Sequence, residues 1–226
     1  MAPIELHGMA PSAPCRTVAM AAECAGVDYT YVSVNPMQGE TKTPEFLAMN
    51  PTHTIPTIKD GDYVLYESRP IASYIMNKYC KDEKMNPQDP ETRGLIDQRL
   101  YFDMGIFYKA LGECIYPVMM GGQKPTDIQQ EKYDKLKEAL GWLDGYVAGG
   151  KFAAGTTCIT VADLALVATY STLKNTAATH KDVLDVSAFK NVEAWFEKCK
   201  GKIIINFHFY YVKIASWILS EMETEK

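Results

Sequence analysis

Ser12 is placed where a hydroxyl group could stabilise a bound anion. It follows the predicted strand 4–9 and lies at the start of the predicted helix 12–26. A hydroxyl in this position can donate a hydrogen bond to a thiolate, and the partial positive charge of the helix N-terminus favours the same anion. The alternative explanation is structural, because serine is a common N-cap that stabilises a helix without taking part in chemistry.

A second group of polar residues, Glu67-Ser68-Arg69, ends one predicted strand and opens the predicted helix 68–80. Ser68 is expected to cap this helix, and Pro70 fits its first turn, where a missing N–H is tolerated. The unpaired backbone N–H groups of such a helix start can bind an anion. Glu67 and Arg69 could recognise an ammonium group and a carboxylate, and the head group of an amino acid carries both.

His53 and the Ile55-Pro56 bond lie between these two groups, just before the hairpin. A proline at the start of the predicted strand 54–58 has no amide hydrogen for a ladder bond, which indicates an edge strand or a cis peptide bond. Asp60-Gly61 then predicts a tight turn into the strand 63–66.

Cys15 is a second candidate for thiol chemistry. Ser12-x-x-Cys15 is similar to a thioredoxin-type CxxC motif in which serine replaces the first cysteine. A thiol one turn into a helix can have a lowered pKa and be reactive. A thiol-transferase that depends on Cys15 is therefore an alternative to chemistry that depends on Ser12.

The elements that carry these residues form an α/β domain followed by helices. Strand, helix and strand at the N-terminus make a βαβ unit, whose crossover should be right-handed. With a short helix at 43–50, the hairpin and the helix 68–80, the order resembles the thioredoxin-like fold. Only helices are predicted beyond this, over 91–120 (long or broken), 127–147, 164–173 behind the cap Thr160 to Asp163, 187–200 and 203–219.

The predicted organisation is a thioredoxin-like domain over 1–80, a charged and proline-containing linker over 81–90, and an all-α domain over 91–226. The net charge of −5 and the absence of a basic stripe argue against nucleic-acid binding. Six scattered cysteines without metal-ligand spacing indicate free thiols in a reducing compartment and no metal site. The N-terminus does not look like a signal peptide, and the polar residues in 203–219 make it a poor membrane span. The protein is expected to be cytoplasmic.

Several motifs agree in order and spacing with one enzyme family. Residues 50–71 resemble the glutathione-binding half of cytosolic glutathione transferases, in which H-x-[IV]-P and E-S recur. Ser12-Ala-Pro-Cys15-Arg16 and residues 98–105 resemble the delta class of the delta/epsilon group in particular. The resemblance spans residues 4 to about 165 and is weaker beyond them. It implies a homodimer that uses glutathione as co-substrate, without a metal, to detoxify small hydrophobic electrophiles.

The resemblance also implies roles for individual residues. Ser12 would hold the glutathione thiolate, His53 would contact the glycyl carboxylate, and the main chain of Ile55, beside Pro56, would pair with the cysteinyl unit. At the γ-glutamyl end, Ser68 would bind the carboxylate and Glu67 the ammonium group. Arg69 would reach the same end or stabilise an acidic partner across a dimer interface. The electrophile would be bound by apolar and aromatic side chains: Ala13, Pro14, Tyr108, Leu111, Tyr116, Met120, Phe207 and Tyr210.

One position departs from the delta pattern. Delta-type enzymes often carry a second histidine in a G-E-H run, whereas this chain has Thr41 there, followed by Lys42. Thr41 cannot replace the histidine donor, although Lys42 could reach a carboxylate. A second alternative therefore stays open, in which a protein of the same fold binds glutathione or an apolar ligand with little turnover. Conjugation of glutathione remains the main prediction.

Overall fold

The computed structural model describes residues 3–179 and 184–203 and divides into two compact units. The centre of the first unit is a four-stranded sheet of order β2-β1-β3-β4. Its strands are β1 (Ile4–Gly8), β2 (Tyr29–Ser33), β3 (Thr57–Asp60) and β4 (Tyr63–Tyr66). β1 runs parallel to β2 and antiparallel to β3, and β3 and β4 form the hairpin. The first unit extends to Asn86, and the second begins at Pro87.

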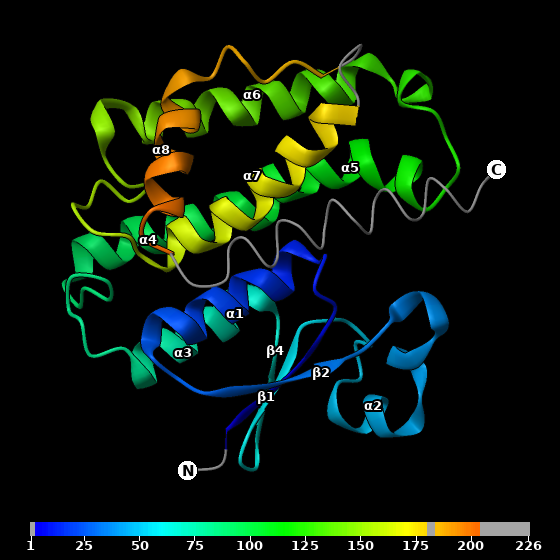
Figure 1. Cartoon of the computed structure of the whole chain (residues 1–226), viewed down its shortest axis with the longest axis vertical. Helices are drawn as coiled ribbons and strands as arrows, with labels where there is room; N and C mark the ends of the chain where they lie inside the picture. Colours follow the sequence, from blue (N-terminus) through cyan, green and yellow to red (C-terminus); the bar gives the residue numbers. More distant parts are fainter. Residues whose placement is uncertain (1–2, 180–183, 204–226) are drawn as a thin grey trace. The chain divides into compact units, whose positions relative to one another are not determined.

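Three α-helices accompany this sheet: α1 (Ala13–Ala25), α2 (Pro44–Met49) and α3 (Ser68–Tyr79). Figure 1 shows α1 and α3 side by side. α1 ends at Gly26, whose left-handed φ of 69° lets its N–H bond back to the carbonyl groups of Ala22 and Glu23. Two short 3₁₀ turns, η1 (Pro36–Gln38) and η2 (Glu40–Lys42), precede α2.

The described part of the second unit contains helices only. They are α4 (Pro90–Phe102), a π-helical segment η3 (Asp103–Phe107), α5 (Tyr108–Met119), α6 (Gln130–Tyr146), α7 (Val161–Thr179) and α8 (Lys190–Lys200), with 3₁₀ turns η4 (Pro125–Asp127) and η5 (Ala148–Gly150). The side chains of α7 are almost all buried up to Leu173. At its start, the buried Asp163 carboxylate accepts hydrogen bonds from the N–H of Thr160 and the indole of Trp195, both at 2.9 Å.

The predicted fold class is confirmed: an α/β thioredoxin-like unit is followed by an all-α unit. Several boundaries were wrong. α6 begins at Gln130 instead of 127, and α7 covers Val161–Thr179 instead of 164–173. The third strand begins at Thr57 instead of 54, because residues 54–56 belong to a loop that Asn50 holds. The helix predicted from 187 begins at Lys190, where Asp144 caps it through the N–H groups of Asn191 and Val192.

The structure does not test two further predictions, the extents of the domains and the last helix. The division between Asn86 and Pro87 falls inside the linker predicted over 81–90, but the extents of the two domains and their separate tasks remain expectations. The helix predicted over 203–219 lies outside the described residues, except for its first position. Within the described ranges, no helix combines the length and the apolar character that crossing a membrane requires.

Candidate functional site

Three segments of the first unit meet at one end of the sheet. In the strand register, His7 of β1 is opposite Thr57 of β3, and Thr57 is opposite Tyr66 of β4. The chain reaches Ser12 shortly after His7, leaves the Ile55-Pro56 bond just before Thr57, and reaches Glu67 directly after Tyr66. Because these three positions form one row across the sheet, the segments that carry the predicted site residues lie at the same sheet end.

The N-termini of α1 and α3 are at this sheet end too, since β1 leads into α1 and β4 leads into α3. Each helix start presents backbone N–H groups without intrahelical partners and carries a partial positive charge. Two such helix starts beside one another favour an anionic ligand. The arrangement therefore suits the binding of a small molecule with negatively charged groups.

Ser12 is the N-cap of α1 and is half-buried. Its Oγ accepts a hydrogen bond from the backbone N–H of Cys15 at 3.4 Å. The structural role that the sequence offered as an alternative is therefore present. It does not exclude the chemical role, because a hydroxyl that accepts one hydrogen bond still has a hydrogen to donate.

The environment of Cys15 is not that of a reactive thiol. Its side chain is fully buried. Burial raises the pKa of this thiol to about 11, against the lowering effects of hydrogen bonds from Ser12 and Met9 and of the Arg16 charge. A thiolate is the reactive form, so this environment does not favour the thiol-transferase alternative.

The start of α3 differs from the prediction in one respect. Glu67, not Ser68, is the N-cap residue, and Ser68 is the first residue of the helix. Glu67 makes no side-chain capping bond and has φ 73° and ψ 112°, a conformation that costs a non-glycine residue about 1–3 kcal/mol. Strained residues of this kind cluster at binding sites.

The two residues after Glu67 are both buried, and their side chains contact each other. Arg69 donates a hydrogen bond from Nη1 to the Oγ of Ser68 at 2.8 Å. The guanidinium group thereby fixes the serine hydroxyl as an acceptor on that side and leaves the hydroxyl hydrogen for another partner. Arg69 therefore orients the hydroxyl of Ser68 at this helix start.

The loop between α2 and β3 carries the remaining predicted residues. His53 is exposed and has a left-handed φ of 48°, and the Ile55–Pro56 bond is cis. Sequence analysis missed Asn50, whose buried side chain bonds to the residues on either side of His53. The only signal was an asparagine directly after a short helix, which is too common to single out.

Thr41, at the position of the missing histidine, is buried in η2, and Lys42 beside it is exposed.

In the second unit, two of the predicted aromatic residues come together on α5. The hydroxyl groups of Tyr108 and Tyr116 form a hydrogen bond, and their rings meet edge to face at 6.4 Å between centroids. Gly112 lies between them, and a Cβ there would come within 3.0 Å of the Tyr116 ring, so glycine makes room for this ring. Both tyrosines line a cavity of about 470 Å³, a volume typical of small-ligand sites.

The other residues predicted for the electrophile site differ in how far they are buried. Leu111 is fully buried and does not line this cavity, whereas Met120 is well exposed at the end of α5. In the first unit, Ala13 is buried and Pro14 half-buried in the first turn of α1. Phe207 and Tyr210 lie outside the described residues.

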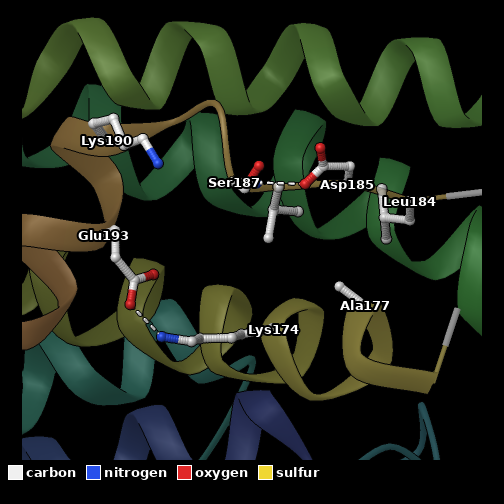
Figure 2. A pocket seen from close by; sticks show the side chains of 8 residues that line it. Lys174, Ala177, Leu184, Asp185, Ser187, Lys190 and Glu193 are labelled. Atoms are coloured by element: carbon white, nitrogen blue, oxygen red, sulfur yellow. Dashed lines mark hydrogen bonds and ion pairs between the residues drawn. The ribbon is translucent and has the colours of Figure 1, made fainter. Parts of the chain in front are cut away.

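A further cavity of about 610 Å³ lies in the second unit between the end of α7 and the start of α8 (Figure 2). The Lys174 amine and the Glu193 carboxylate form an ion pair across one side of it. None of the predicted site residues lines this cavity, so it is separate from the candidate site. No cluster of three or more potential metal ligands occurs among the residues that the structure describes.

The chain is similar to known proteins in both sequence and structure. A family model described as the N-terminal domain of glutathione S-transferase matches residues 6–83, and one described as the C-terminal domain matches residues 126–198. Among curated proteins, glutathione S-transferase D7 of Anopheles gambiae is 36% identical over 203 residues, which cover 90% of this chain and 88% of the relative.

Solved structures give the same result. A delta-class glutathione transferase of Nilaparvata lugens superposes with a TM-score of 0.87 at 36% identity, covering 97% of this chain and 100% of the other. A glutathione transferase homologue of Drosophila mojavensis, solved with bound glutathione, superposes with a TM-score of 0.84 at 26% identity, covering 99% and 98% of the two chains.

Proposed function

Because the chain belongs to the glutathione S-transferase family and is a glutathione-conjugating enzyme, we propose that Ser12 holds the thiolate that attacks its electrophiles. The resemblance to delta-class enzymes predicted from the motifs is confirmed by the matches. The observation that carries the proposal is the row of His7, Thr57 and Tyr66, since it gathers the three site segments at one sheet end beside two helix N-termini.

The γ-glutamyl end of glutathione is assigned to the start of α3. Its carboxylate would accept hydrogen bonds from the first backbone N–H groups of the helix and from the hydroxyl of Ser68, which Arg69 orients. Glu67 would bind the ammonium group. The strained backbone of Glu67 supports this assignment, because it turns the chain sharply between β4 and α3 at the point where the head group would lie.

The other end of glutathione is assigned to the loop before β3. The exposed imidazole of His53 would bind the glycyl carboxylate, and the main chain of Ile55, beside Pro56, would pair with the cysteinyl unit. With both ends held, the sulfur would be directed to Ser12. The hydroxyl of Ser12 then donates to the sulfur while its oxygen accepts from the N–H of Cys15.

The electrophile is assigned to a site that includes the cavity of Tyr108 and Tyr116. Their edge-to-face rings offer apolar surface, and their paired hydroxyl groups offer one polar position. With an aryl halide, the thiolate forms a carbon–sulfur bond and the carbon–halogen bond breaks, so that the halide leaves with the electron pair. The thiol proton has by then passed to solvent.

We also propose that the protein is a cytoplasmic homodimer. Exposed apolar side chains of α4 and η3, namely Leu95, Tyr101 and Met104, would suit burial against a second copy. Light scattering of the purified protein tests this assignment independently of activity. A monomer at micromolar concentration would contradict it.

The function is tested by assaying conjugation of glutathione to a chromogenic aryl halide, with the wild type beside Ser12→Ala. Activity in the wild type and its loss in the variant, with glutathione still bound, is the expected result. Activity that survives Ser12→Ala would contradict the role of this hydroxyl. Glutathione binding without turnover in the wild type would favour the non-catalytic alternative.

A further inference from the structure

Asn50, in the loop between α2 and β3, has a fully buried side chain. Its amide oxygen accepts hydrogen bonds from the N–H and the hydroxyl of Thr52, at 2.9 and 2.7 Å. Its amide nitrogen donates to the carbonyl oxygen of Thr54 at 3.0 Å and to the hydroxyl of Thr57 at 2.9 Å. One side chain therefore binds the loop on both sides of His53.

The main chain of Asn50 adds two more connections. Its carbonyl oxygen accepts from the N–H of His53 at 3.0 Å, and its own N–H donates to the carbonyl oxygen of Phe46 at 2.7 Å. Phe46 belongs to α2, so the loop is bonded to a helix as well as to the first residue of β3. His53 is held in its left-handed conformation between residues that Asn50 fixes.

We propose that Asn50 is a positioning residue for glutathione binding: it holds His53 and the main chain of Ile55 in the orientation in which they contact the ligand. The inference rests on the proposed function, which assigns these two residues to glutathione. The side chain of Asn50 is fully buried, so we expect it to act through its neighbours and not by direct contact with glutathione. Its effect is transmitted through Thr52, Thr54 and the main chain of His53.

The chemistry of the amide group explains why asparagine is needed. A carboxamide offers two N–H donors and an acceptor oxygen with two lone pairs on one planar group, and Asn50 uses both kinds. Aspartate has the same shape but no N–H donor, so it would turn a negative oxygen toward the carbonyl oxygen of Thr54. Alanine would remove all of the side-chain hydrogen bonds that Asn50 makes to the loop.

The test compares Asn50→Asp with a milder variant, Thr57→Val, which keeps the shape of the side chain and removes the hydroxyl. Thr57 is fully buried, and its hydroxyl accepts from Asn50 and donates to the carbonyl oxygen of Thr54 at 3.1 Å. We expect Thr57→Val to raise the KM for glutathione about tenfold and to change the KM for the aryl halide less than about twofold. Asn50→Asp should act in the same direction, and Thr57→Ser should restore the wild-type KM.

A matched control separates positioning from a general loss of stability. Asn86, in the same unit, is also buried and donates from its amide to the carbonyl oxygen of Met76 at 3.1 Å. Asn86→Asp should lower the melting temperature without raising the KM for glutathione. A selective rise in this KM for Asn50→Asp and Thr57→Val, absent in Asn86→Asp, supports the inference.

His53→Ala distinguishes the two ways in which the experiment could fail. If His53→Ala raises the KM for glutathione while Thr57→Val and Asn50→Asp leave it unchanged, the positioning role is overturned and the proposed site stands. If His53→Ala also leaves it unchanged, the assignment of this loop to glutathione is overturned, and the inference falls with it. Equal losses of affinity for both substrates would show a structural role only.

Discussion

The hydroxyl oxygen of Ser12 accepts a hydrogen bond from the backbone N–H of Cys15 at 3.4 Å. This bond occupies a lone pair of the oxygen and does not use the hydroxyl hydrogen. The residue can therefore cap α1 and donate to a thiolate at the same time. Capping and catalysis, which are alternatives in the sequence, are compatible in the structure.

Ser12→Ala should reduce the fraction of bound glutathione present as thiolate at neutral pH by about tenfold or more. The reason is that a hydrogen bond to a charged group contributes about 1.5–3 kcal/mol, and its loss raises the pKa of the bound thiol. The thiolate is measured by its ultraviolet absorbance in the enzyme–glutathione complex across a pH series.

Thr43→Ala is the matched control for this change. Thr43 caps α2, and its hydroxyl oxygen accepts from the N–H of Phe46 at 3.3 Å. Each variant loses one N-cap, so each should lose about 1 kcal/mol of unfolding free energy. Only Ser12→Ala should lose thiolate, and an equal loss in both would point to capping alone.

Ser68→Ala should weaken glutathione binding about 10- to 100-fold. The variant removes a hydroxyl donor to the γ-glutamyl carboxylate, and a charge-assisted hydrogen bond contributes about 1.5–3 kcal/mol. It also leaves the guanidinium of Arg69 without the acceptor that it has at 2.8 Å. Titration calorimetry measures the affinity. Ser73→Ala, further along α3, is the control, and affinities that match for both variants would contradict the assignment.

Local sequence signals predict the first unit well because its elements begin and end at residues with strong backbone preferences. Gly26 ends α1 with a left-handed φ, and Gly61 allows the tight turn between β3 and β4. The order of strands and helices follows from such positions together with the hydrophobic pattern. The sequence also indicates Ser12 and Glu67 as site residues, since both adjoin predicted helix starts.

Features that depend on distant residues could not be predicted in this way. α8 begins three residues later than predicted because its first N–H groups are capped by Asp144, which belongs to α6. The role of Asn50 depends on how the loop folds back onto its side chain. The N-cap of α3 is Glu67 and not the predicted Ser68, because Glu67 adopts a positive φ against its intrinsic preference.

Gly8→Ala should destabilise the first unit by about 1–3 kcal/mol through overpacking. A Cβ at this position would lie 2.8 Å from the Sγ of Cys15 and 3.3 Å from the hydroxyl of Tyr31. Adding Cys15→Ala should recover part of the loss, because it removes the sulfur but not the Tyr31 contact. Urea unfolding of the two single variants and the double variant measures this coupling. Strictly additive effects would show that the sulfur is not the obstacle.

Asp60, at the opposite end of β3 from the candidate site, connects the hairpin to the end of α3. Its Oδ2 accepts hydrogen bonds from the hydroxyls of Tyr74 and Tyr79, at 2.7 and 2.6 Å, and from the amine of Lys78 at 2.7 Å. Partial burial alone raises the pKa of Asp60, but the hydrogen bonds from Lys78, Tyr79 and Tyr74 outweigh it and hold the pKa below its usual value.

Asp60→Asn should lower the unfolding free energy by about 1–2 kcal/mol near neutral pH, since a partly exposed carboxylate loses its charge-assisted bonds. A lowered pKa in the folded state means that this contribution is present above the unfolded pKa of about 4 and is lost as the pH falls through the folded value. Urea unfolding at a series of pH values should therefore show the difference between wild type and variant shrinking below about pH 4. Asp62→Asn, an exposed change in the same turn, should show no such pH dependence. A difference that stays constant down to low pH would mean that the Asp60 charge does not hold the hairpin to α3.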